Sequence, residues 1–277
     1  IHMPSVTLTG PVPWHQLRRG PTRRRSRGLP TLRNLAAALF AAGVVTVLAN
    51  APAASAQSAC AELGGSVDDE QTCRVHVSNP TYTLDFTFPA DYPDQQAITD
   101  YLRQTRDGFV NVSDMPGSWN LPYVLDARGT DYRSGAPEDT DADAATPQPA
   151  PAADEAGTRS VVFEVYENVG GAHPQTWYKS FNWDVEADAP LTFETLFRPD
   201  TRPLDVIFPI VQADVARQLG VDAPIAPADG LDPAKYQQFA LTDEELIFFF
   251  GQGEIMAGAG GALRATVPRS AIADMLA

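Results

Sequence analysis

The chain is poor in the side chains that most often carry enzyme chemistry. Its 277 residues include four histidines, two cysteines and two lysines, Lys179 and Lys235. It has no G-x-S-x-G nucleophile elbow, no P-loop, and no Cys and His residues at the spacing of a zinc site. Beyond residue 56 the only histidines are His76 and His173, so a catalytic triad would have to use one of them. We therefore expect no metal and no cofactor.

Positive charge is scarce outside the first 56 residues. That segment holds seven arginines and no acidic residue, which leaves 13 of the 20 basic residues and all 35 acidic ones in the remainder, a net charge of −22. Nucleic acids and anionic lipids are bound by cationic surfaces. The composition therefore argues against both as partners through bulk charge.

The basic N-terminal segment has the features of a targeting signal. The arginines precede an apolar run of about 15 residues, 35–49, which is shorter than the roughly 20 residues of a membrane-spanning helix. Ala54-Ser55-Ala56 then matches a small-residue cleavage site. We predict a signal peptide over 1–56, with Ile1-His2 a cloning remnant, cleavage near Ala56-Gln57 and a secreted, extracellular mature protein. An uncleaved anchor is the alternative; after cleavage we expect no stable membrane insertion.

The two cysteines, Cys60 and Cys73, lie in the predicted mature part and close a short loop that contains Gly64-Gly65. Disulfides persist in exported proteins. A metal site is the alternative, but it needs further ligands, and only His76 is close in sequence. We predict a disulfide.

Residue patterns over 57–277 predict a single α+β domain. Alternating or apolar runs predict strands over 73–77, 81–88, 123–132, 160–169, 176–183, 246–250 and 263–267. Helical spacing predicts helices from Pro93 to about Phe109, from Leu204 to Leu219, and from Pro268 to Leu276. Strands in pairs followed by helices favour a mixed or mostly antiparallel sheet, with β-hairpins, packed by two to three helices.

Residues 134–158 differ from the rest of this domain. The segment carries six acidic residues and many Pro and Ala, without aromatic or large aliphatic side chains. Such a segment buries too little apolar surface to offset the entropy of ordering. We predict a mobile acidic loop. Its Asp-rich run fails the calcium-loop pattern, because Ala144 and Ala150 replace the required Gly and Glu.

One local cluster stands out between two predicted strands. Gly170-Gly171-Ala172-His173-Pro174 is followed by Tyr178 on the second strand. Consecutive glycines permit positive φ, and Pro174 restricts the exit from the turn. We predict that Gly170, Gly171, His173, Pro174 and Tyr178 form a binding site at a hairpin tip. A tight turn without a ligand is the alternative.

The sequence resembles a family, the mycobacterial secreted immunogenic proteins, whose domain also occurs in the extracellular part of lysozyme-sensing anti-sigma factors. The similarity spans residues 60–277. Its motifs include Asp91-Tyr92-Pro93-Asp94-Gln95, Val165-Tyr166-Glu167-Asn168, Gly170-Gly171-Ala172-His173-Pro174, Phe208-Pro209-Ile210-Val211-Gln212, Ile247-Phe248-Phe249-Phe250 and Val267-Pro268-Arg269-Ser270-Ala271-Ile272.

The resemblance implies a secreted α+β protein of the immunogenic type without a settled activity. Some relatives are described as esterases, and others bind a protein ligand. Our main hypothesis is a non-catalytic extracellular binding protein, a monomer, whose partner is a protein or a small ligand. The alternative is a secreted esterase of short acyl esters, with His173 as the base and a serine that the sequence does not identify. A purely structural envelope protein is the third hypothesis.

Overall fold

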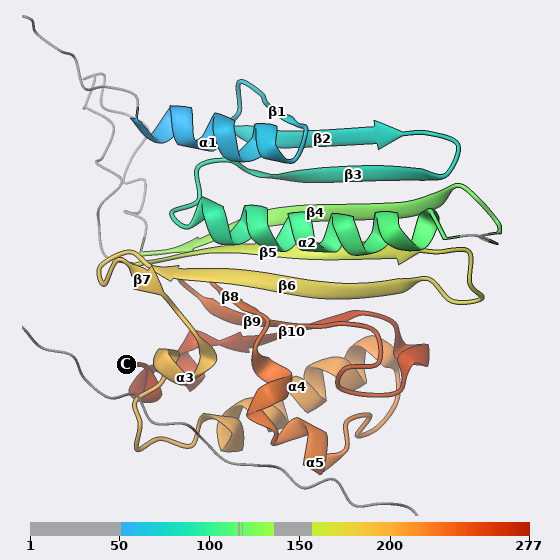
Figure 1. Ribbon diagram of the computed structural model, residues 1–277. Coiled ribbons are helices and arrows are strands. Elements are labelled where there is room, and N and C mark those ends of the chain that lie inside the picture. Colours follow the sequence, from blue (N-terminus) through green and yellow to red (C-terminus); the bar gives the residue numbers. More distant parts are fainter. Residues whose placement is uncertain (1–50, 116, 118, 136–156) are drawn as a thin grey trace, which may run out of the picture. The chain divides into compact units, whose positions relative to one another are not determined.

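The computed structural model describes residues 51–115, 117, 119–135 and 157–277. All of them belong to one unit of the chain, residues 48–277. They form two β-sheets with accompanying helices (Figure 1). The larger sheet holds its strands in chain order: β1 (Ser66–Val67), β2 (Thr72–Ser78), β3 (Tyr82–Pro89), β4 (Tyr123–Ser134), β5 (Thr158–Asn168), β6 (Gln175–Asp184) and β7 (Ala189–Pro190).

The smaller sheet has the order β10-β9-β8 and is made of β8 (Phe239–Leu241), β9 (Glu245–Phe250) and β10 (Leu263–Pro268). The α-helices in the described ranges are α1 (Ala51–Glu62), α2 (Gln95–Ser113), α3 (Phe193–Leu196), α4 (Pro203–Leu219) and α5 (Pro227–Gly230). Neighbouring strands are antiparallel in both sheets except for β3 and β4, which are parallel. The predicted α+β class with a mostly antiparallel sheet is confirmed. The parallel pair follows from α2, which crosses over between these two strands.

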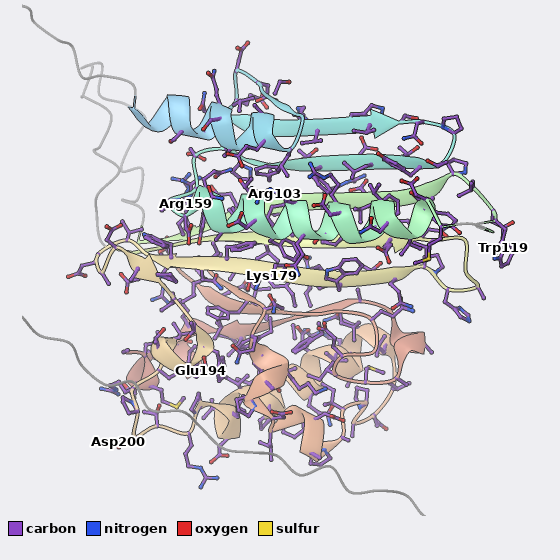
Figure 2. All side chains as sticks on the ribbon, viewed as in Figure 1. Arg103, Trp119, Arg159, Lys179, Glu194 and Asp200 are labelled. Atoms are coloured by element: carbon purple, nitrogen blue, oxygen red, sulfur yellow. A yellow bond between two sulfur atoms is a disulfide. The ribbon has the colours of Figure 1, made fainter. Side chains whose placement is uncertain are left out.

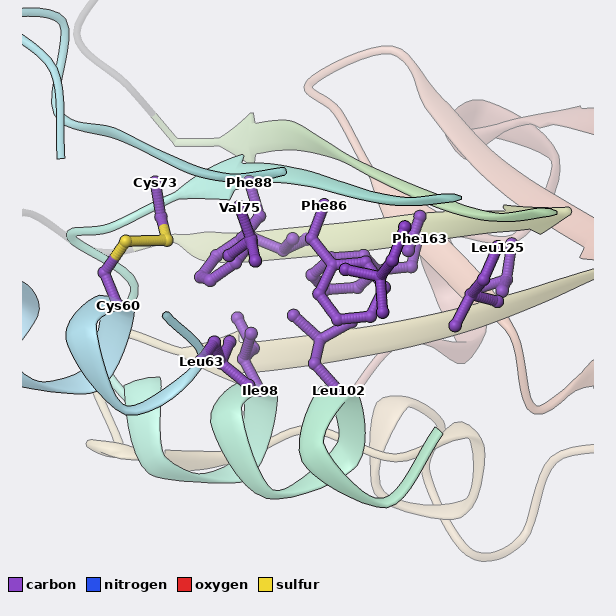
Figure 3. Packing of buried hydrophobic residues seen from close by; sticks show 14 of the residues in the cluster. Cys60, Leu63, Cys73, Val75, Phe86, Phe88, Ile98, Leu102, Leu125 and Phe163 are labelled. Carbon is purple, nitrogen blue, oxygen red and sulfur yellow. A yellow bond between two sulfur atoms is a disulfide. The ribbon is translucent and has the colours of Figure 1, made fainter. Parts of the chain in front are cut away.

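The first core lies between α2 and one face of the larger sheet (Figure 3). Successive side chains of a strand point to opposite faces, so Leu84, Phe86 and Phe88 of β3 share one face. All three are buried, as are Ile98 and Leu102 on the facing side of α2. The period-2 and helical patterns in the sequence therefore identify the two surfaces that pack together.

The second core lies between the smaller sheet and the helices α3 and α4. On β9, Leu246 to Phe250 are all buried, as expected for a strand covered on both faces. Helix α4 contributes Ile207, Val211 and Val215, and it ends at Gly220, whose φ of 67° closes the helix.

The two sheets meet at a third, small cluster. Val162 of β5 packs there with Ala240, Ile247 and Phe249 of the smaller sheet. Strand β5 is therefore covered on both faces, by α2 on one side and by β8 and β9 on the other. This junction positions the neighbouring strand, β6, along which the candidate site lies.

Three sequence predictions differ from the structure or lie partly outside it. The predicted last helix, 268–276, is present only as two short 3-10 helices, Arg269–Ala271 and Ala273–Met275. Helix α1 begins at Ala51 and continues across the predicted cleavage position, while residues 1–50 lie outside the described ranges. Residues 136–156 of the predicted acidic loop also lie outside them, although its two ends pair in the sheet, Ser134 opposite Thr158. None of the helices described has the length and apolar character of a transmembrane segment.

The predicted disulfide joins Cys60 of α1 to Cys73 of β2, and both residues are fully buried. We expect the double variant Cys60→Ala/Cys73→Ala to lose about 3 kcal/mol of unfolding free energy, because the unfolded chain is no longer closed into a short loop. Urea unfolding followed by circular dichroism measures the change. Unchanged urea midpoint and slope in the double variant would contradict the expectation.

Candidate functional site

The predicted hairpin tip is present, between β5 and β6. The Gly170 N–H donates to Asn168 Oδ1 (3.0 Å), and its carbonyl accepts from Asn120 Nδ2 (3.2 Å). Gly170 has a φ of 75°. His173 is exposed and forms no hydrogen bond or ion pair with another described residue. The tip is therefore held by hydrogen bonds to Gly170, one of them from Asn120 in the connection between α2 and β4, and not by His173.

Tyr178 lies away from this tip. Its ring faces the smaller sheet, 5.3 Å from the ring of Phe249, and its hydroxyl donates to Glu164 Oε2 (3.1 Å). Burial, with the negative charge of Glu164, raises the pKa of Tyr178 to about 12. The structure brings Gly170, Gly171, His173 and Pro174 together at one turn, while Tyr178 contributes to the contact between the sheets.

The other histidine has the more organised surroundings. His76 and Asp85 lie directly opposite each other on β2 and β3, and His76 Nδ1 is 2.6 Å from Asp85 Oδ1. Such a bond selects the ring tautomer and leaves Nε2 as a base. Both side chains are on the surface. The sequence analysis did not single out this pair, although a signal for it was present. The Asn79-Pro80 turn between two alternating strands sets these residues opposite each other.

Serine chemistry is not supported by the described hydrogen bonds. No serine hydroxyl in the described ranges is bonded to His76 or His173. Ser180, a strand residue near the middle of β6, uses its hydroxyl in a buried network. Its Oγ bonds to Gln238 Oε1 (3.3 Å) and accepts from the Phe239 N–H (3.2 Å). Ser180 is therefore a structural residue. The described residues also contain no cluster of three or more His, Cys, Asp or Glu that could hold a metal ion.

A cleft runs along the edge of β6. Strand β7 pairs with β6 at Trp183 and Asp184, and in the part of the chain that the structure describes no strand of the same sheet covers the preceding part of that edge. The Ser180 N–H instead donates to Gln238 Oε1 (2.7 Å). The cleft has a volume of about 260 Å³ and is lined by Tyr92, Asp94, Ala97, Lys179, Ser180, Phe181, Asn182, Trp183, Pro190, Leu191, Thr192, Gln237 and Phe239.

Lys179 is the cation of this cleft (Figure 2). It is half-buried, its Nζ lies 5.3 Å from the centre of the Phe181 ring, and it makes no ion pair with a described residue. Burial penalises the ammonium form and lowers the pKa of Lys179. Lysines are rarely buried without a partner, so this amine is a candidate ligand-binding group.

Asn182 supplies the second unusual group of the cleft. Its side chain is buried, and its Nδ2 donates to Ser180 Oγ (3.3 Å). Its Oδ1 is buried without a hydrogen-bond partner among the described residues, and so is the Oγ of Ser160, which lies directly opposite on β5. Buried polar atoms are nearly always paired, so these two atoms belong to the contact between β5 and β6. Neither Lys179 nor Asn182 was singled out by the sequence analysis, because nothing in a local pattern marks the uncovered edge of a strand.

Gly170 and Gly171 form a matched pair for a stability test. At Gly170 an added Cβ would lie 2.6 Å from the Trp119 carbonyl oxygen, and φ is positive; at Gly171 nothing lies within 4 Å. We expect Gly170→Ala to lower the unfolding free energy by about 1–3 kcal/mol. Gly171→Ala should change it by less than about 0.5 kcal/mol. Urea unfolding of both variants checks this, and equal effects would contradict the turn geometry.

Lys179 and Lys235 are the only lysines, so their side-chain signals can be followed individually. We expect the pKa of Lys179 to lie below the ordinary lysine value of 10.5, because burial disfavours its charged form. NMR titration of the lysine Cε signals measures it, with Lys235→Arg providing the assignment. A midpoint for Lys179 at or above 10.5 would contradict the burial argument.

Comparison with known proteins places the chain in a family. A model described as a protein of unknown function, DUF3298, matches residues 194–270, from α3 to just beyond β10. A protein named esterase Rv3036c, from Mycobacterium tuberculosis, is 52% identical over 83% of this chain and 93% of its own length. Immunogenic proteins MPT64 of M. tuberculosis and MPB64 of Mycobacterium bovis are each 39% identical over 86% of this chain and 97% of their own.

Among solved structures, a DUF3298 family protein from Pseudomonas aeruginosa is similar with a TM-score of 0.48 and 13% identity, over 76% of this chain and 96% of that chain. The family suggested by the sequence motifs is confirmed by the identities over nearly the whole length of the curated relatives. The chain belongs to the family of the immunogenic proteins MPT64 and MPB64.

Proposed function

We propose that this protein is a non-catalytic binding protein that acts outside the cell and takes up a small ligand in the cleft along β6. Three features support the extracellular site of action: the predicted signal peptide, the buried disulfide, and the immunogenic proteins among its relatives. Binding without catalysis is supported by the lack of a described serine hydroxyl bonded to either histidine.

The observation that carries the proposal is an amine without an ion-pair partner among the described residues, in a cleft with aromatic walls. Lys179 is half-buried, and the burial of its charged form costs free energy. A ligand that pairs with it recovers part of this cost. The aromatic side chains Tyr92, Phe181 and Trp183 offer the apolar walls that ligand sites commonly have.

Filling the cleft tests the proposal. Ala97 lines it from the first turn of α2, whereas Ala61 is exposed on α1. We expect a mixed set of small acids, sugars, amines and acylated amino acids to contain at least one compound that raises the melting temperature of the wild type and of Ala61→Phe, but not of Ala97→Phe. If no compound does so, or if Ala97→Phe responds equally, the binding function at this cleft is wrong.

A second function, hydrolysis of short acyl esters, is favoured by one observation. The His76–Asp85 pair has the geometry of a general base with its orienting carboxylate, and a relative at 52% identity is named an esterase. In this function His76 Nε2 takes the proton of an attacking water, and Asp85 stabilises the imidazolium. The water oxygen adds to the ester carbonyl, the bond to the alcohol breaks, and the proton passes to the alcohol oxygen.

The two histidines distinguish these functions. His76 is bonded to a carboxylate and His173 is not, so His173→Ala is the matched control for His76→Ala. Under the binding function we expect hydrolysis of p-nitrophenyl acetate to be unchanged in both variants. A loss of about 10²-fold confined to folded His76→Ala would establish the esterase with His76 as base, and one confined to His173→Ala would restore the hairpin histidine to that role.

A further inference from the structure

We infer that the cleft along β6 binds a small organic compound that carries a single carboxylate group. The inference rests on the proposed binding function and names the class of ligand. It follows from what each lining residue still lacks in the protein itself.

The first requirement is a negative charge. Lys179 has no carboxylate partner among the described residues, and Asp94, the other charged residue of the lining, is used elsewhere. Asp94 Oδ1 accepts the Ala97 N–H (3.1 Å) as the N-cap of α2. An anion in the cleft would pair with Lys179 and form charge-assisted hydrogen bonds, which are about twice as strong as neutral ones. Because Asp94 repels a second negative group, a monoanion fits better than a dianion.

The polar groups on the other face of β6 place no second demand on the ligand. The Ser180 Oγ accepts hydrogen bonds from Phe239 N and Asn182 Nδ2, and it donates to Gln238 Oε1 or Gln237 O. Asn182 Oδ1 has no hydrogen-bond partner among the described residues, but it is fully buried, and Asn182 lies directly opposite Ser160, whose Oγ is also buried without a partner. The charge of Lys179 is therefore the group that a ligand has to match.

The second requirement is size and shape. A volume of about 260 Å³ lies below the roughly 300–1,000 Å³ range of pockets for drug-sized ligands. Lys179 and Phe181 project from one face of β6, and Ser180 and Asn182 project from the other, since alternate side chains point to opposite faces. The cleft therefore spans the edge of the strand, and its occupant is a small molecule that presents its anion to the face that carries Lys179. Neutral sugars leave Lys179 unpaired, and amines add a second cation.

Two probes test the charge requirement. N-acetyl-L-alanine has the carboxylate, and N-acetyl-L-alanine amide has nearly the same size and shape without the charge. By isothermal titration calorimetry we expect N-acetyl-L-alanine to bind the wild type with an affinity at least about tenfold higher than its amide. Lys179→Gln should lose about tenfold or more for N-acetyl-L-alanine and little for the amide, while Lys235→Gln, outside the cleft, should match the wild type.

Equal binding of N-acetyl-L-alanine and its amide by the wild type would overturn the carboxylate assignment. Failure of N-acetyl-L-alanine to bind at millimolar concentration would also overturn the inference. The binding function would survive each of these results if the wider set of compounds still contains one that stabilises the wild type but not Ala97→Phe. The wild-type comparison of probes remains decisive even if Lys179→Gln folds poorly.

Discussion

The burial of β5 on both faces is the constraint on which the rest of this structure depends. Val161 and Phe163 pack toward α2, and Val162 packs against the smaller sheet. A slip of one residue would exchange these faces and place every side chain against the wrong layer. The register of β5 therefore links the core under α2 to the contact between the sheets. Strands β4 and β6, which pair with β5, take their own registers from it.

The candidate site follows from this arrangement at the next strand. Strand β6 shares the two-sided environment of β5, but β7 covers only its end, at Trp183 and Asp184. Side chains of both faces therefore reach one cleft at the edge: Lys179 from the α2 side and Asn182 from the other. At Ser180 this edge bonds to the side chain of Gln238 and not to the backbone of another strand. The cleft lies in the space beside it.

A buried arginine holds the other wall of the cleft in place. Arg159 of β5 donates to the Asp91 carbonyl (2.7 Å) and to Asp91 Oδ1 (2.6 Å), and its Nε lies 3.2 Å from Asp131 Oδ1. These bonds fix the connection between β3 and α2, which carries Tyr92 and Asp94 into the cleft. Strand β5 thus positions the site twice, through its packing and through this arginine.

Local pattern in the sequence determined much of this protein. Side-chain periodicity identified the long strands and the helices α2 and α4, and the isolated cysteine pair predicted the disulfide, because these features depend on neighbours close along the chain. Only the tertiary structure decided the short strand β8, the division into two sheets and the 3-10 turns at Arg269–Ala271 and Ala273–Met275, which depend on long-range pairing. The same reason applies to the site. His173 was visible as part of a local turn, whereas the cleft that contains Lys179 exists only once distant segments, from Tyr92 to Phe239, come together along the edge of β6.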